Sequence, residues 1–246
     1  MTENSSAPAL EVRGLTRRYG SKAVVRDLDL CVQPGDIYGF LGPNGAGKTT
    51  TMRMILGLIR KNAGEIAIFG DADPVAARRH LGGIVETPRF YPYLSGRDNL
   101  RVLAAYGPGV TPARIEELLQ LVQLGERARD QVKTYSLGMK QRLGIAQALL
   151  ARPKLLMLDE PVNGLDPAGM KQVRELIRTL RDEQGLTVFV SSHLLHDVEQ
   201  LCDRIGIIQD GTKITEGPVA DLVEEGESLE DAFLRHTAPG AREQIR

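Results

Sequence analysis

The chain has 246 residues, which is enough to bury a sizeable core, and its formal net charge is −1. A nearly neutral chain gives no electrostatic reason to expect a nucleic acid as partner. Its two cysteines, Cys31 and Cys202, show no C-x-x-C or metal-ligand spacing, so we interpret them as packing residues in a reducing compartment. No apolar run reaches the roughly 18 residues of a membrane helix, and the N-terminus lacks a signal-peptide pattern. These features predict a soluble cytoplasmic protein that could still dock on a membrane partner.

The N-terminal region has the alternating pattern of β-strands. Residues 10–20 and 22–36 are predicted to form two strands of an antiparallel edge sheet. Tyr19 falls at the turn between them, where an exposed ring could stack on adenine. An ordinary half-buried tyrosine at the sheet edge fits the same pattern, so the sequence leaves both interpretations open.

A glycine-rich loop follows the apolar strand candidate 37–41 and precedes a helix-like segment. Residues 42–50 read GPNGAGKTT and fit the pattern G-x-x-x-x-G-K-S/T. Glycines let backbone N–H groups point inward around a phosphate, and the following helix adds its positive end. We expect Lys48 to reach the β and γ phosphates and the Thr49 hydroxyl to bind Mg²⁺. A plain glycine-rich turn before a helix is the alternative. The predicted ATP-binding residues of the loop are Gly42, Pro43, Asn44, Gly45, Ala46, Gly47, Lys48, Thr49 and Thr50.

The middle of the chain changes from strands to helices. Residues 63–70 and 83–85 are predicted strands with a short helix between them. Beyond them, Ser95, Thr111 and Ser136 are each placed to cap a helix, the first to about Tyr106 and the second to about Leu124. We therefore predict an all-helical subdomain at 87–152, inserted between two strands of the core.

Acidic residues end the next buried strand candidate, KLLMLDE. A carboxylate there, Asp159, can hold Mg²⁺ through its water shell opposite Thr49. The next residue, Glu160, could turn beyond the strand end towards the γ-phosphate and act as the base for water. A solvated Asp-Glu pair is the alternative. His193 follows the strand after that, at an edge where parallel sheets present ligand-facing groups, although a lone histidine is more often structural.

The remaining segments predict helices at 167–184, 194–202 and 228–236 and a hairpin at 205–217. Strands that alternate with helices imply a mostly parallel sheet covered on both sides. We thus predict an α/β fold with a P-loop NTPase core, an antiparallel edge sheet and the helical insert. It forms one domain, 1–236, whose core is 1–86 and 153–236, followed by a disordered tail, 237–246.

Taken in order, these motifs resemble the ATP-binding cassette family over nearly the whole chain. Residues 42–49 are similar to its Walker A motif, 155–160 to Walker B, 163–166 to the D-loop that ends at Asp166, and 191–193 to its switch histidine. The most diagnostic piece is YSLGMKQR at 135–142, which resembles the family's LSGGQ signature at the head of a helix.

The resemblance implies a homodimer that closes head to tail around two Mg-ATP. The signature residues of one subunit would cover the γ-phosphate held by the other, because a helix N-terminus with a hydroxyl and a bare glycine amide stabilises an anion. An N-cap serine without further role is the alternative. The implied signature residues are Ser136, Leu137, Gly138 and Met139; the catalytic residues are Glu160, His193 and Lys48; the metal ligands are Thr49, Glu86 and Asp159.

Two departures from the family pattern stand out. Leu137 and Met139 replace the usual glycine and glutamine of the signature, which removes close backbone or polar contacts and could weaken ATP-driven closure. Glu86 replaces the usual glutamine after the strand that follows Walker A. A carboxylate there would add negative charge beside Mg²⁺ and could bind the ion directly.

Residues 85–100, with this glutamate, resemble the ATPase subunits of bacterial exporters for peptide antibiotics of the bacitracin and lantibiotic type. The resemblance implies that the chain powers a separate membrane permease, which exports a drug, antimicrobial peptide or lipid-like substrate. Phe90, Tyr91 and Tyr93 are candidate permease contacts, with core packing as the equal alternative. The rival functions are a soluble cassette ATPase uncoupled from transport and a nucleotide-sensing regulatory subunit without turnover.

Overall fold

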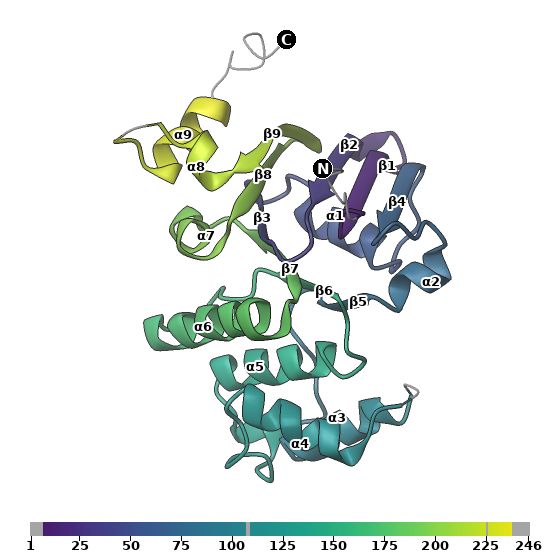
Figure 1. The fold of residues 1–246 in the computed structure, drawn as a ribbon, viewed down its shortest axis with the longest axis vertical. Coiled ribbons are helices and arrows are strands. Elements are labelled where there is room, and N and C mark those ends of the chain that lie inside the picture. The colour runs from purple at the N-terminus through teal and green to yellow at the C-terminus, as the bar shows by residue number, and fades with distance from the viewer. Residues whose placement is uncertain (1–6, 107–108, 225, 238–246) are drawn as a thin grey trace, which may run out of the picture.

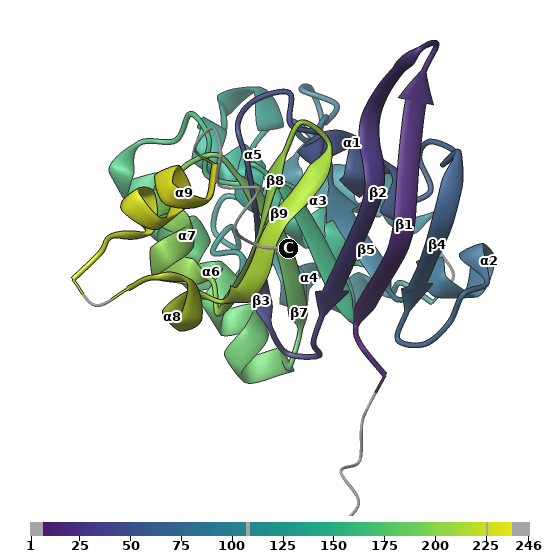
Figure 2. The same cartoon turned by 90° about the horizontal axis from the view of Figure 1, so that it is seen from above.

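The computed structural model describes residues 7–106, 109–224 and 226–237, which form two sheets and a set of helices (Figure 1). The smaller sheet is antiparallel and has the order β2-β1-β4. Its strands are β1 (Leu10–Tyr19), β2 (Lys22–Val32) and β4 (Ala63–Ile68), which lie side by side in the view from above (Figure 2). The predicted antiparallel sheet is confirmed, and β4 adds a third strand that the sequence did not assign to it.

The larger sheet contains six strands in the order β5-β6-β7-β3-β8-β9. The pairs from β5 to β8 are parallel, whereas β9 returns antiparallel to β8 as the predicted hairpin. The strand bounds are β3, Ile37–Leu41; β5, Leu81–Ile84; β6, Leu155–Asp159; β7, Thr187–Ser192; β8, Arg204–Gln209; β9, Thr212–Pro218. Strand β5 begins two residues before the predicted strand, because Leu81 and Gly82 pair with Leu155 and Leu156.

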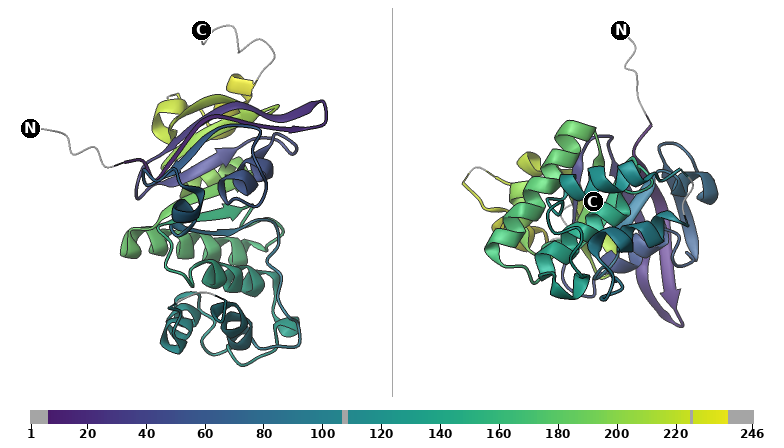
Figure 3. Two further views of the ribbon diagram at one scale, coloured as in Figure 1. Left: turned by 90° about the vertical axis from the view of Figure 1, so that its right-hand side faces the viewer. Right: turned by 90° about the horizontal axis from the view of Figure 1, so that it is seen from below.

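Both faces of the larger sheet are covered, as the unbroken apolar runs predict. Along β6, Leu155 and Met157 belong to the core shared with the antiparallel sheet, whereas Leu156 and Leu158 belong to the core beneath the opposite face. Helix α1 (Lys48–Ile55) lies between the two sheets, where Met52 and Ile55 are buried. Helices α6 (Pro167–Gln184) and α7 (Leu195–Leu201) cover the other face, as Figure 3 shows in side view. The predicted fold class is thereby confirmed.

The segment between β5 and β6 is helical. It contains α3 (Gly96–Ala104), α4 (Pro112–Leu121), a short 3₁₀ turn at Val132–Thr134 and α5 (Leu137–Ala148), stacked below the sheet in Figure 1. Each predicted cap is present: the side chains of Ser95, Thr111 and Ser136 accept backbone N–H groups at 3.0, 3.2 and 3.2 Å. Helices α3 and α4 end two to three residues earlier than predicted.

Short helices complete the chain. Helix α2 (Pro74–Arg78) connects β4 to β5, and α8 (Val219–Leu222) and α9 (Leu229–Thr237) follow β9. The predicted tail begins at Thr237, which is the last residue of α9, and its remainder lies outside the described residues. No helix within the described ranges is long and apolar enough to cross a membrane.

Candidate nucleotide-binding and catalytic site

The predicted site residues follow the ends of three adjacent parallel strands, at one edge of the larger sheet. In the order β6-β7-β3, the strands end at Asp159, Ser192 and Leu41. The carboxyl ends of parallel strands meet at the same edge, which is where ligands bind in open α/β sheets. The fold therefore brings the Walker A loop, the acidic pair and His193 together, although more than a hundred residues separate the first from the others.

The loop between β3 and α1 is shaped by close backbone packing. A Cβ added to Gly42 would stand 2.3 Å from the carbonyl oxygen of Ile208, so β8 leaves no room for a side chain. Gly47 has φ of 108°, in the left-handed region that glycine tolerates. No side chain caps α1 at Gly47, so the N–H groups of its first turn remain available to an anion.

Lys48 is buried at the centre of this loop. Its Nζ donates to the carbonyl oxygen of Gly42 at 2.6 Å and lies 3.5 Å from Glu160 Oε1. The ammonium therefore stands between the phosphate loop and the acidic strand end. A phosphate bound at the loop would contact the Lys48 ammonium directly, because the surrounding loop already holds that ammonium in position.

Thr49 and Asp159 form the link between α1 and β6. The Thr49 hydroxyl donates to Asp159 Oδ2 at 2.8 Å, and the Ser191 hydroxyl donates to Asp159 Oδ1. Hydroxyl and carboxylate oxygens are the ligands that Mg²⁺ prefers, and the ion keeps several waters when nucleotide phosphates supply the rest. The donor set at this position fits Mg²⁺.

Glu160 leaves the strand direction immediately after Asp159. Its φ of +49° turns the chain, and its N–H reaches the Ser191 carbonyl and hydroxyl oxygens at 3.2 and 3.1 Å. The Oε1 atom of its carboxylate faces Lys48. The Oε2 atom lies 2.7 Å from Nδ1 of His193. The bend explains how two consecutive carboxylates face the same site, since strand residues otherwise alternate between faces.

The signature segment lies apart from this cluster within its own chain. Ser136 caps α5, and Leu137 is 44% exposed at the helix start. A Cβ added to Gly138 would find its nearest neighbour 3.8 Å away, so the surface at this glycine is open. Asp166 caps α6 by accepting the Gly169 N–H at 2.9 Å. In the described part of the chain, no hydrogen bond joins the signature residues to the phosphate loop.

Two predicted site residues, Glu86 and Tyr19, lie outside the core cluster. Glu86 is exposed and forms an ion pair with Arg53 of α1. It makes no hydrogen bond to Thr49 or Asp159 among the described contacts. The Tyr19 ring is half exposed, and the Arg17 guanidinium lies 4.4 Å from its centroid. This arrangement is compatible with a stacking surface and with ordinary edge packing alike.

The three aromatic residues of the loop before α3 differ in burial. Phe90 is partly buried against the core, whereas Tyr91 and Tyr93 are exposed with ring centroids 5.9 Å apart. Two exposed tyrosines on one loop form an apolar surface with polar tips, which is typical of protein contact sites.

Sequence reasoning missed two residues beside the site. Ser191 bonds to both Asp159 and Glu160, and its register opposite Asp159 in the β6–β7 pair is the signal that could have revealed it. Phe233 of α9 lines a hollow of about 280 Å³ together with Asn44, His193 and Leu195. Only the fold could place that phenylalanine there, because nearly two hundred residues separate it from the phosphate loop.

A strand, a glycine loop and a helix that starts with lysine and threonine define a nucleotide-binding protein of the phosphate-loop class, and two carboxylates stand at the end of β6, separated from β3 by one strand of the same sheet. Residues 25–163, more than half of the chain, match the family model described as ABC transporter. The chain therefore belongs to the ABC transporter family, as one of its ATP-binding ATPase proteins. The predicted resemblance is confirmed.

Characterised relatives extend over most of the chain. It is 49% identical to the bacitracin transport ATP-binding protein BcrA of Bacillus licheniformis, over 87% of this chain and 71% of that protein. It is 41% identical to the lantibiotic transport ATP-binding protein SrtF of Streptococcus pyogenes, over 91% and 95% of the two chains. A solved ATP-binding subunit of an ABC transporter superposes with a TM-score of 0.81 at 32% identity, covering 93% of this chain and 99% of that one.

Proposed function

We propose that this chain hydrolyses Mg-ATP as a homodimer and thereby powers a separate membrane permease that exports a peptide antibiotic or a related drug or lipid-like compound. The contacts that join Thr49, Asp159 and Ser191 to Glu160 and His193 are the observation that carries the ATPase part. They hold both the metal-binding and the proton-accepting groups against one phosphate loop.

In this proposal each residue of the cluster has a distinct task. Lys48 and the first-turn N–H groups of α1 bind the phosphates. Thr49 and Asp159 would hold Mg²⁺, which would supply positive charge to neutralise the phosphate oxygens. Glu160 accepts a proton from the attacking water, and His193 holds that carboxylate through Nδ1 while its other ring nitrogen faces the γ-phosphate. Positioning and charge neutralisation account for most of the catalysis.

The open signature surface supports the dimer. Ser136 and Gly138 present a helix start and an uncovered glycine, yet within the described residues no hydrogen bond joins them to the phosphate loop of their own chain. A second copy arranged head to tail would supply that loop, with Asp166 and its neighbours between the two sites. Tyr19 would stack on the adenine.

The coupling to export rests on the relatives named for bacitracin and lantibiotic transport. The exposed Tyr91 and Tyr93 are the proposed contact with the permease. The chain would then lie at the cytoplasmic face of the membrane and be held there by this partner. No part of the proposal requires a nucleic acid.

Affinity purification of the tagged chain from detergent-solubilised membranes of its own host tests the coupling. We expect a polytopic membrane protein to co-purify, and less of it with Tyr91→Ala/Tyr93→Ala, with Tyr106→Ala as an exposed tyrosine control. Recovery of ribosomes, or of the chain alone from both membrane and soluble fractions, would instead favour a cassette ATPase that is not coupled to transport. Phosphate release by the purified dimer decides between an ATPase and a non-hydrolysing sensor.

A further inference from the structure

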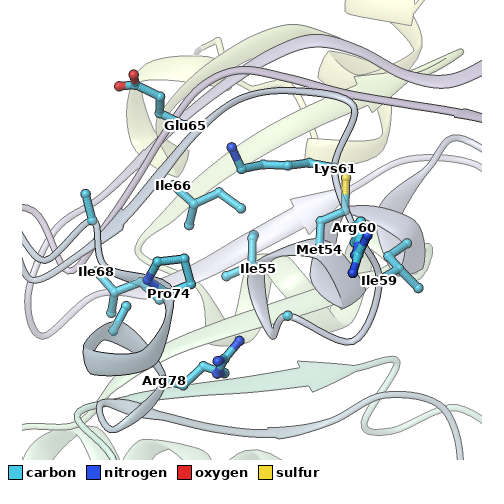
Figure 4. Close-up of a pocket in the computed structure, with 13 residues that line it drawn as sticks. Met54, Ile55, Ile59, Arg60, Lys61, Glu65, Ile66, Ile68, Pro74 and Arg78 are labelled. Carbon is cyan, nitrogen blue, oxygen red and sulfur yellow. The ribbon is translucent and has the colours of Figure 1, made fainter.

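A second hollow lies between the end of α1, strand β4 and helix α2, and none of its lining residues belongs to the phosphate loop (Figure 4). Its volume is about 570 Å³, within the roughly 300–1,000 Å³ of small-molecule sites. Its floor is apolar and is formed mainly by Met54, Ile55, Ile59, Ile66, Ile68 and Ala77. Such a floor suits a hydrocarbon chain, because apolar burial scales with the area removed from water.

The rim of this hollow is cationic. Arg60, Lys61 and Arg78 line it, and Glu65 is the single acidic residue among the described lining residues. Figure 4 shows the Glu65 carboxylate directed away from the apolar side chains, and the three cationic side chains outnumber it. Lys61 donates to the Gly64 carbonyl, whereas the side chains of Arg60 and Arg78 make no hydrogen bond or ion pair within the described ranges.

The Arg78 side chain lies against the backbone at Gly57. A Cβ added to Gly57 would lie 2.8 Å from Arg78 Nη1, so the guanidinium rests against the backbone just beyond the end of α1. An arginine fork held in this way can bind a carboxylate through two parallel hydrogen bonds. An apolar floor and an unpaired arginine on the rim together match a ligand that is apolar along its length and anionic at one end.

We propose that this hollow binds a free single-chain carboxylate amphiphile, with its hydrocarbon chain on the floor between α1, β4 and α2 and its carboxylate on Arg78. The ligand would contact Met54 and Ile55, which belong to the same helix that begins with Lys48. The site shares no lining residue with the proposed permease contact, and its test requires no nucleotide.

Calorimetric titration of the full chain with decanoate, below the concentration at which decanoate self-associates, tests the site. We expect saturable binding to one site, and at least tenfold weaker binding of decanol, which has the same chain without the charge. Arg78→Ala should weaken decanoate binding about tenfold or more. Arg79→Ala is the matched control, because Arg79 is the adjacent exposed arginine and does not line the hollow, and it should leave the affinity unchanged.

A second variant tests the apolar floor without removing a charge. Ala72 is exposed at the edge of the hollow, so Ala72→Phe should obstruct the chain site and abolish decanoate binding while Ala72→Ser preserves it. Circular dichroism on every variant checks the fold, and Ala72→Phe decides the question if Arg78→Ala proves unstable. Equal affinity for decanoate and decanol, equal loss in both arginine variants, or binding to anionic phospholipid vesicles without binding to decanoate would overturn the proposal.

Discussion

The phosphate-loop cluster and the signature segment differ in how many of their groups find partners within one chain. In the cluster, Lys48, Thr49, Asp159 and Glu160 each bond to another member or to the loop that surrounds them. At the signature, Ser136 caps its own helix, but Leu137 and the surface of Gly138 face outward. The first region is preorganised within one chain, whereas the second leaves an uncovered surface, which in our proposal a second copy of the chain uses. Variants in the two regions should therefore fail in different ways.

Glu160→Gln should give the largest loss. The amide keeps the shape of the side chain but cannot accept a proton, so we expect hydrolysis to fall by 10²-fold or more while ATP still binds. Because closure no longer ends in hydrolysis, an ATP-bound dimer should accumulate and be visible by size-exclusion chromatography with light scattering. Glu183→Gln on the exposed face of α6 is the charge-matched control. Normal phosphate release by Glu160→Gln would remove the assignment of the base.

Lys48→Ala should instead impair the monomer's own binding step. The ammonium supplies charged hydrogen bonds to phosphate, each of which contributes about 1.5–3 kcal/mol, so ATP affinity should fall roughly ten- to a hundredfold per lost bond. Equilibrium binding of labelled ATP by the isolated chain is the measurement. Unchanged affinity would show that the loop holds no phosphate at this lysine, and the two regions would then not differ as proposed.

Gly138→Ala separates folding from function at the signature. The added methyl has ordinary space, with its nearest neighbour at 3.8 Å, and alanine is the better helix former by about 1 kcal/mol. We expect thermal stability to rise slightly or stay constant and monomeric ATP binding to be unaffected. Hydrolysis should fall by about tenfold, because the methyl group blocks the approach of the partner's γ-phosphate to the helix start. Loss of hydrolysis together with loss of stability would point to a structural role.

The sequence predicted the fold class well and located the polar residues at the strand ends, because both depend on local patterns. The four apolar residues of β6, the three capped helices and the loop that ends at Lys48 can each be recognised within a short stretch of sequence. The pairing of β4 with β1 could not be predicted, since nothing in the local sequence of a strand selects its partner. The assignment of 87–152 as a separate subdomain stays a prediction.

The side-chain partners were less accessible to sequence reasoning than the strands. The bend at Glu160 arises from a positive φ in a residue that is not glycine, which no propensity favours. Ser191 contacts Asp159 and Glu160 because of the register between β6 and β7. Arg53 of α1 pairs with Glu86, which follows β5. These relations depend on three-dimensional register, whereas the identity of each polar residue at a strand end was already apparent.

Glu86→Gln should give the smallest effect of these variants. In the sequence, Glu86 lies between the phosphate loop and the signature segment. Its carboxylate is largely exposed and pairs with Arg53, and a pair of this kind contributes at most about 1 kcal/mol to stability. We therefore expect an unchanged melting temperature. If Glu86 also takes part in holding Mg²⁺ when ATP is bound, the Mg²⁺ concentration for half-maximal hydrolysis should rise by a few-fold in Glu86→Gln, because a neutral amide binds the ion more weakly. Arg53→Ala breaks the same ion pair but keeps the carboxylate, so it should leave that Mg²⁺ requirement unchanged or lower it. Identical Mg²⁺ curves for Glu86→Gln and the natural chain would mean that the pair with Arg53 is the whole role of Glu86.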